Sequence, residues 1–187
     1  MNLWRVVPLD RTAGVNQAGG ALWIPRALQG VGRHDNPELY GCLYVSETPV
    51  SAIAEHLAPF RGTGRLLSSM LMKFGLPLAL VELHLPDEAA LIDFDDPDVL
   101  KENDLRPSQL ATRIRETTQA DAQKLSREHP EAAGIRWWST LEPSWINVSI
   151  FDRAVEALTL GDEVVLDTGN GHVRESADYL GLTLSSS

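Results

Sequence analysis

One part of the chain gathers residue types that can do chemistry. It holds Arg33 in the run Gly32 to Pro37, Tyr44 at the end of an apolar run, and Glu55 in a helical pattern. An arginine presents a planar fork of N–H donors that suits phosphate oxygens. Tyr44 offers an aromatic face and Glu55 a carboxylate. With Ser139 further along the chain, these side chains are the candidates for a functional site.

Common nucleotide-binding and hydrolase motifs are absent. The chain has no GxxxxGK[ST] loop, no GxGxxG after a strand, no HExxH and no GxSxG. Its five histidines are scattered without the spacing of metal ligands: His34, His56, His84, His129 and His172. We therefore expect no metal.

The order of several short motifs points to a family. Near the N-terminus stands Trp-Arg-Val, and Gly32-Arg33 is followed by Asn36 and Pro37. Tyr44 and Glu47 form Tyr-x-x-Glu at a helix start, and Glu55 follows Tyr44 by eleven residues. The later runs 134–139 (GIRWWS) and 147–151 (NVSIF) complete the pattern. Over about residues 3–152 the chain resembles the RES domain family, whose members are toxins of bacterial toxin–antitoxin pairs.

The chain departs from the usual RES pattern around the arginine. The family's GGRWN, with a following Pro and Gly, appears here as GRHDNP, and Arg33 lies one residue further from Tyr44. The alternative run 19–23 (GGALW) lacks an arginine. Arg33 is therefore the better match.

The resemblance implies a fold and a reaction. RES toxins resemble ADP-ribosyltransferases and break the bond between nicotinamide and ribose in NAD⁺. Cleavage passes through an oxocarbenium-like transition state, which a carboxylate stabilises. We therefore expect a cytoplasmic NAD⁺ glycohydrolase that uses NAD⁺ as substrate and no further cofactor. An Xre-type antitoxin, a helix-turn-helix DNA-binding protein, is the implied partner, and a homodimer is an open possibility.

The resemblance also assigns roles to residues. Glu55 would stabilise the positive charge, and Arg33 would bind the pyrophosphate. Tyr44 would stack on the nicotinamide. Ser139 would hydrogen-bond the carboxamide or position Glu55, and Asn147 joins the residues expected to bind NAD⁺.

Each of these residues also has a structural interpretation. Arg33 could pair with Asp35 on a loop surface, and Tyr44 could be an ordinary strand aromatic. Glu55 could be a solvated helix residue, and Ser139 could cap a turn before Pro143. Two other functions stay open: transfer of ADP-ribose to a protein, and an inactive RES-like domain that only binds a partner.

The net charge, the cysteine count and the lack of long apolar stretches disfavour several classes of protein. The 187 residues carry a formal net charge of −10, which disfavours binding to nucleic acid. Cys42 is the single cysteine, so an intramolecular disulfide cannot form. We find neither a signal peptide nor an apolar stretch of membrane-spanning length. These features favour one cytoplasmic domain over residues 1–187.

The elements that must position the candidates follow from local patterns. Strands are expected at the β-branched or apolar runs 3–7, 42–45, 78–85, 91–94, 134–138 and 147–151. A helix should start at Thr48-Pro49 and run to about Phe60. Further helices are expected at 66–74 and, on the surface, at 107–128.

The last part of the chain is expected to hold a hairpin and a weak helix. Residues 155–166 read as a hairpin around Gly161-Asp162, and residues 171–180 as weakly helical. Residues 10–41 form a long structured loop of the kind that often serves a site. Without a regular β-α-β rhythm, the pattern predicts an α+β fold with a mixed or antiparallel sheet and flanking helices.

Overall fold

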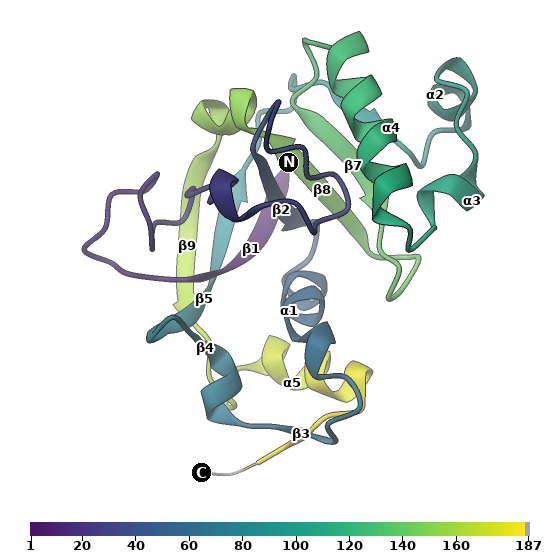
Figure 1. Ribbon diagram of the computed structural model, residues 1–187. Coiled ribbons are helices and arrows are strands. Elements are labelled where there is room, and N and C mark those ends of the chain that lie inside the picture. The colour runs from purple at the N-terminus through teal and green to yellow at the C-terminus, as the bar shows by residue number, and fades with distance from the viewer. Residues whose placement is uncertain (186–187) are drawn as a thin grey trace. The chain divides into compact units, whose positions relative to one another are not determined.

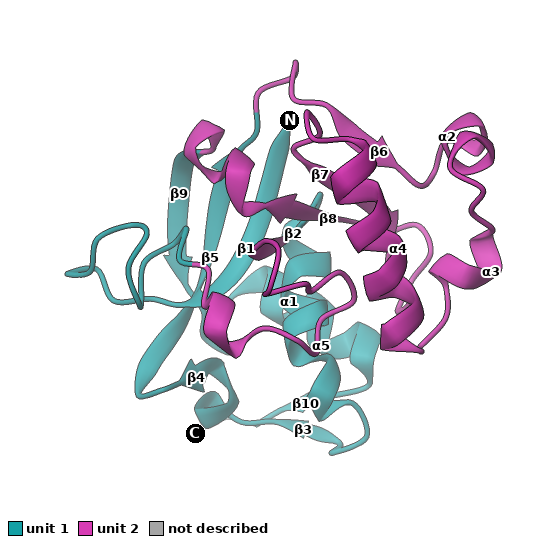
Figure 2. Ribbon diagram, turned by 45° about the horizontal axis from the view of Figure 1, so that its top comes forward, with its two compact units in different colours: residues 1–23, 45–85, 159–187 teal, residues 24–44, 86–158 magenta. Residues whose placement is uncertain are grey.

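The computed structural model describes residues 1–185 (Figure 1). It divides into two compact units, coloured separately in Figure 2. Of these described residues, unit 1 comprises 1–23, 45–85 and 159–185, and unit 2 comprises 24–44 and 86–158. The chain first passes from unit 1 to unit 2 after Trp23, and it returns within strand β2 (Cys42–Ser46).

Unit 1 is built on antiparallel strands. Strand β1 (Asn2–Pro8) pairs with β5 (Leu76–His84) from Asn2↔His84 to Pro8↔Leu78. Strand β9 (Thr159–Val165) also pairs with β5, and β1 meets the end of β2 at Trp4↔Ser46. The short β4 (Met72–Lys73) forms a hairpin with the start of β5. Strand β1 buries Leu3 and Val7, whereas β5 buries four consecutive residues, 78–81.

The helices of unit 1 pack against one another. Thr48 caps α1 (Pro49–Leu57) by accepting a hydrogen bond from the Ser51 N–H, as expected from the sequence. A 3₁₀ turn, η2 (Ala58–Phe60), follows it. Helix α5 (Gly171–Leu180) packs on α1, and Ser176 Oγ donates to the Val50 carbonyl oxygen at 2.9 Å. Strands β3 (Arg65–Leu66) and β10 (Thr183–Leu184) pair in parallel.

Unit 2 has its own strands and helices. Its strand order is β2, β8 (Ile146–Phe151), β7 (Gly134–Trp138) and β6 (Leu91–Asp93). Strands β7 and β8 are antiparallel, whereas β6 and β7 are parallel. Its helices are α2 (Pro97–Glu102), α3 (Pro107–Leu110) and α4 (Arg115–Glu128), with 3₁₀ turns η1 (Arg26–Leu28) and η4 (Asp152–Ala157). A buried cluster that includes Phe94, Leu125, Ile135 and Phe151 forms its core.

The α+β class with mixed strand pairing and flanking helices is confirmed. Three local predictions are wrong. Residues 66–74 are not one helix: after β3 they form a 3₁₀ turn, η3 (Ser68–Leu71), and β4. Both Phe74 (φ 56°) and Gly75 (φ 79°) have positive φ, as a tight hairpin between β4 and β5 requires.

The other two errors come from tertiary contacts. The expected hairpin in residues 155–166 is instead η4 followed by the single strand β9, because β9 pairs along β5 through the position expected to turn. The expected helix 107–128 is broken between α3 and α4. The broken stretch supplies carbonyl oxygens that bind Arg33.

Candidate functional site

Arg33 is buried in unit 2 rather than displayed on a loop surface, with 5% of its area exposed. Its Nη1 donates to the carbonyl oxygens of Leu110 at 2.7 Å and Thr112 at 3.0 Å. The guanidinium carbon lies 5.1 Å from the centroid of a Trp137 ring, a cation–π distance. Arg33 therefore stabilises the turn between α3 and α4.

The loop of residues 30–36 is built around the carboxylate of Asp35. Its Oδ2 accepts the N–H groups of Gly30 at 2.8 Å and Gly32 at 2.7 Å. Its Oδ1 accepts the Tyr44 hydroxyl at 2.7 Å, and that hydroxyl accepts the His34 N–H at 3.0 Å. Burial raises the pKa of Tyr44 well above its ordinary value, so the hydroxyl stays protonated and donates. Tyr44 thus holds the loop that carries Arg33.

Gly32 has a steric role in this loop. A Cβ at position 32 would lie 2.5 Å from the Tyr44 hydroxyl oxygen and 2.6 Å from Asp35 Oδ1. Only glycine fits without displacing that hydrogen bond. The Gly-Arg pair of the sequence motif therefore has a packing reason.

The side chains of His34 and Ser149 form a buried polar pair that contacts Trp137, the residue next to the Arg33 guanidinium. His34 Nδ1 is 2.9 Å from Ser149 Oγ, which also accepts the Trp137 Nε1–H at 3.1 Å. The His34 ring meets the rings of Trp137 and Phe94 edge to face. Burial, with the positive charges of Arg33 and Arg115, lowers the pKa of His34 to about 3. His34 is therefore a neutral ring that supports Trp137, the residue stacked against Arg33.

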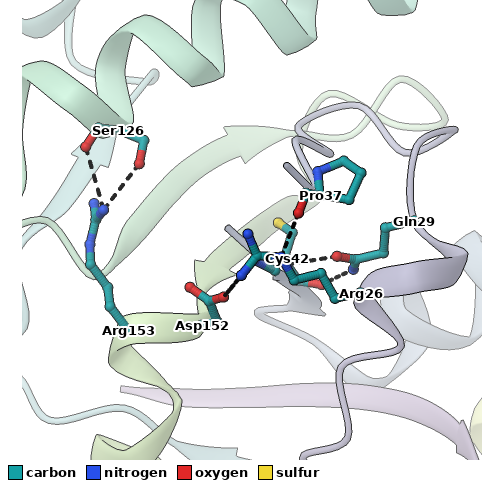
Figure 3. A network of polar contacts seen from close by, with 8 residues as sticks. Arg26, Gln29, Pro37, Cys42, Ser126, Asp152 and Arg153 are labelled. Atoms are coloured by element: carbon teal, nitrogen blue, oxygen red, sulfur yellow. Dashed lines mark hydrogen bonds and ion pairs between the residues drawn. The ribbon is translucent and has the colours of Figure 1, made fainter. Parts of the chain in front are cut away.

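Further contacts anchor both ends of the segment 24–44 (Figure 3). Asp152 Oδ2 accepts the Gly41 N–H at 2.6 Å and pairs with Arg26 Nη1 at 3.4 Å. The Gln29 side chain bonds the N–H and the carbonyl oxygen of Cys42. On helix α4, Gln119 Nε2 donates to the carbonyl oxygens of Gly30 and Gly32. The segment 24–44 is thus held by contacts with α4 and η4, and those with α4 are made to the loop 30–36 itself.

Ser139 and Asn147 lie at the Trp138 end of β7 and the start of β8 in the same unit. Ser139 is 1% exposed, and its Oγ accepts the Leu141 N–H at 2.9 Å, so it caps the turn that its structural interpretation predicted. Asn147 is buried and pairs with Trp137 across the two strands. Both side chains therefore belong to the β7–β8 framework.

Glu55 belongs to unit 1, on α1. It is half-buried and lines a pocket of about 460 Å³. The apolar part of the lining consists of Pro59, Phe60, Met70 and Met72. His56 and Lys73 supply its other polar groups. Glu55 is thus the carboxylate of a mixed apolar and polar pocket rather than a residue on an open helix face.

His56 and Lys73 were not predicted as site residues. His56 adjoins Glu55 in the sequence, which was the one available signal, whereas Lys73 stands in a segment expected to be helical. Burial and the nearby Lys73 charge lower the pKa of His56 to about 4, so its ring is neutral at neutral pH. Within residues 1–185 that ring forms no hydrogen bond to another part of the protein.

The predicted residues are thus partly brought together. Arg33 and Tyr44 meet through His34 and Asp35, while Ser139 and Asn147 lie on paired strands of the same unit. Glu55 lies in the other unit. Over residues 1–185 no group of three His, Cys, Asp or Glu side chains is arranged to hold a metal ion. No helix in this range has the length and apolarity needed to cross a bilayer.

Comparisons with known proteins identify the family. A chain in the crystal structure of the M. tuberculosis MbcT–MbcA toxin–antitoxin complex is similar in fold, with a TM-score of 0.63 and 16% identity. The similarity covers 97% of this chain and 87% of that chain. A search of curated proteins gives no match. The RES domain matches residues 2–168, and this protein therefore belongs to the RES domain family.

Proposed function

We propose that this protein is the toxin of a toxin–antitoxin pair and that it breaks the bond between nicotinamide and ribose in NAD⁺. Membership of the RES domain family supports the proposal. So does the likeness in fold to a chain of a toxin–antitoxin complex. NAD⁺ is the substrate, and the proposed reaction needs no further cofactor.

The observation that carries the proposal is the pocket beside Glu55. Leaving-group departure creates positive charge on the ribose, and a carboxylate at the wall of a partly apolar pocket stabilises that charge more than it would in water. The pocket volume of about 460 Å³ is within the usual range for small-molecule sites. Glu55 is therefore the proposed catalytic residue.

The remaining assigned residues are proposed to bind NAD⁺: Arg33, Tyr44, Ser139 and Asn147. Arg33 and Tyr44 also hold the loop 30–36 and its neighbours in place. Their substitution therefore affects folding as well as binding. Substitution of Glu55 tests the reaction more directly, because Glu55 lines a pocket and is not part of the hydrogen bonds that hold the loop 30–36.

The test is NAD⁺ breakdown by purified protein over time, with release of nicotinamide measured in parallel. We expect breakdown by the wild type and a rate lower by on the order of 100-fold in Glu55→Gln. Glu175→Gln, on the exposed face of α5 in the same unit, is the matched control and should keep the wild-type rate. Equal rates in Glu55→Gln and wild type would remove Glu55 from the reaction.

The acceptor of ADP-ribose defines an alternative within the same chemistry. Both reactions release nicotinamide: with water as acceptor the other product is free ADP-ribose, whereas with a protein as acceptor it is an ADP-ribosylated protein. Mass spectrometry of proteins incubated with the enzyme and NAD⁺ separates the two. We propose water.

The burial of Arg33 favours a second candidate function, a RES domain that binds a partner without turning over NAD⁺. Its guanidinium bonds the carbonyl oxygens of Leu110 and Thr112 and lies against Trp137. Absence of nicotinamide release from correctly folded wild-type protein would support this candidate. Growth arrest on expression, relieved by Glu55→Gln, would exclude it.

The proposed partner is an Xre-type antitoxin, and the proposed compartment is the cytoplasm, where NAD⁺ is available. The net charge of −10 suits a partner with a basic surface. Co-expression with the partner should restore growth and co-purify the two chains. A homodimer is a further possibility that light scattering would test.

A further inference from the structure

Residues 58–75 of unit 1, which connect α1 to β5, carry positive charge in an acidic protein. This basic segment contains Arg61, Arg65 and Lys73 and has no Asp or Glu. The whole chain, in contrast, has 26 acidic residues and 16 Lys or Arg residues. The charge of the basic segment is therefore opposite in sign to the net charge of the protein.

The three cations of the basic segment have no acidic partner in the described part of the chain. Arg61 and Arg65 are exposed, and within residues 1–185 their side chains form no hydrogen bond and no ion pair. Lys73 is also exposed, and its ammonium nitrogen lies 5.4 Å from the centroid of the Phe74 ring, a cation–π distance. No contact with a carboxylate within residues 1–185 therefore neutralises these charges.

The two ends of the basic segment lie close together. Pro59, just after α1, lines the same pocket as Met72 and Lys73 of β4. Between them, η3 connects β4 to β3, the strand that contains Arg65. Figures 1 and 2 both show β3 and β4 at the same end of unit 1. The basic segment therefore forms one end of unit 1.

Phe74 lies at a turn of this segment in a conformation that is unusual for phenylalanine. Lys73 pairs with Leu76, so Phe74 and Gly75 form a two-residue hairpin turn, and both have positive φ. Asn, Asp or Gly is preferred at the first position of such a turn, because a bulky side chain is strained at positive φ. Phe74 is nonetheless 74% exposed, so burial within the fold does not offset the strain. Folding therefore does not account for an aromatic residue at this position.

The basic segment also exposes apolar groups besides the Phe74 ring. Leu67 and Met72 are exposed large apolar residues on either side of η3. The cation–π contact with Lys73 restricts the Phe74 side chain, so less conformational entropy is lost when the ring is buried by a partner. Protein interfaces combine such aromatic anchors with a charged or polar rim.

We propose that the basic segment binds an acidic segment of a partner protein that also carries apolar residues. Phe74 is the anchor that the partner buries, and Arg61, Arg65 and Lys73 pair with carboxylates around it. An anionic membrane fits less well, because three cations are fewer than the roughly four to eight of typical lipid-binding basic segments. The proposal does not depend on the reaction with NAD⁺.

Phage display with a library of random peptides tests the proposal on the full chain. The wild-type protein is the target, and a variant with both Phe74→Asn and Arg65→Glu is used for counter-selection. We expect the enriched peptides to combine Asp or Glu with Leu, Ile or Phe. Enriched peptides without acidic residues, or no enrichment on the wild type over the variant, would overturn the proposal.

A synthetic peptide from the selection then measures the contribution of each residue. Calorimetry should show binding weaker on the order of 30-fold in Phe74→Asn, as expected for loss of an interface anchor. Arg65→Glu should weaken binding about tenfold and reduce its dependence on salt concentration. Leu28→Asn on η1 and Arg127→Glu on α4 change exposed residues outside the segment and should bind like the wild type. Unchanged affinity in Phe74→Asn would contradict the proposed anchor.

The stability of Phe74→Asn is an independent check. Asn followed by Gly favours this turn, so the variant should unfold at the same temperature as the wild type or a higher one, although it loses peptide binding. A lower unfolding temperature would show that the Phe74 ring serves the fold, and the anchor role would be rejected. We expect no binding to phosphatidylglycerol vesicles in a sedimentation assay. Vesicle binding by the wild type that Phe74→Asn abolishes would assign the segment to a membrane instead.

Discussion

The Nη1 atom of Arg33 donates to the carbonyl oxygen of Thr112 at 3.0 Å, and the same atom donates to that of Leu110 at 2.7 Å. These two carbonyl groups lie at the interruption between α3 and α4. Arg33, which the sequence motifs predict to bind substrate, therefore also stabilises the fold. The consequence is that loss of activity on its substitution does not by itself demonstrate substrate contact.

Substitution of Arg33 by alanine should destabilise the protein by about 3 kcal/mol, because two charge-assisted hydrogen bonds are lost, one to the buried carbonyl group of Leu110 and one to the partly buried carbonyl group of Thr112. Urea unfolding measures the change, and hydrogen exchange should rise at residues 110–118. Arg113→Ala removes an exposed arginine from the same turn and should change the free energy of unfolding by less than about 0.5 kcal/mol. Wild-type stability in Arg33→Ala would contradict the structural role.

Tyr44→Phe removes the hydroxyl that joins Asp35 to the His34 N–H. We expect a loss of about 1–3 kcal/mol, because a buried carboxylate oxygen and a buried N–H lose their partner. A double-mutant cycle with Asp35→Asn, followed by urea unfolding, measures the coupling. The two effects should not add. Simple additivity would mean that Tyr44 and Asp35 act independently.

The neutral His34 ring predicts a pH dependence of stability. Its pKa falls from an ordinary 6.5 to about 3 in the folded protein, so between these values the unfolded chain binds a proton that the folded chain does not. Stability is complete above pH 6.5 and is lost as the pH falls toward 3. The slope from this group approaches about 1.4 kcal/mol per pH unit.

The measurement is the free energy of unfolding at several pH values between about 5 and 6.5. His34→Gln keeps a polar partner for Ser149 and should remove the part of the slope that comes from His34, while His56, whose pKa is lowered to about 4, keeps its own part. His172→Gln, on an exposed position of α5, should leave the slope as in the wild type. An unaltered slope in His34→Gln would show that His34 is not the group that resists protonation.

Two glycine substitutions should have opposite effects. A Cβ at Gly134 would lie 2.2 Å from the Ser149 carbonyl oxygen, a backbone atom of the paired strand, so Gly134→Ala should cost at least about 2 kcal/mol. At Gly171, the first residue of α5, nothing lies within 4 Å of the added atom. Gly171→Ala should therefore stabilise the protein by up to about 1 kcal/mol. Thermal denaturation followed by circular dichroism compares the two.

Strands and helix starts could be predicted where the conformation depends mainly on residues close together in the sequence. The runs that became β1, β5, β7 and β8 have apolar or β-branched residues in strand-length stretches. The start of α1 follows from Thr48 and Pro49, whose preferences act within one turn. Such elements depend on neighbours in the sequence.

The incorrect predictions concern segments whose conformation depends on distant partners. Gly161 and Asp162 are typical turn residues, yet pairing with β5 keeps them within β9. The helix expected over 107–128 is broken where Arg33, 77 residues before Leu110, binds the freed carbonyl group. The hairpin at Phe74 and Gly75 then places Lys73 in the pocket beside His56.

The sequence by itself determined the α+β class, most of the strands, the caps and the ordered motifs that point to the RES family, because these depend on residue type and short spacing. The tertiary structure alone decided that Arg33 is buried against carbonyl oxygens, that Tyr44 supports a loop and that Lys73 lines a pocket with Glu55. These features depend on hydrogen bonds and packing between residues that are far apart in the chain. Local sequence patterns therefore do not predict them.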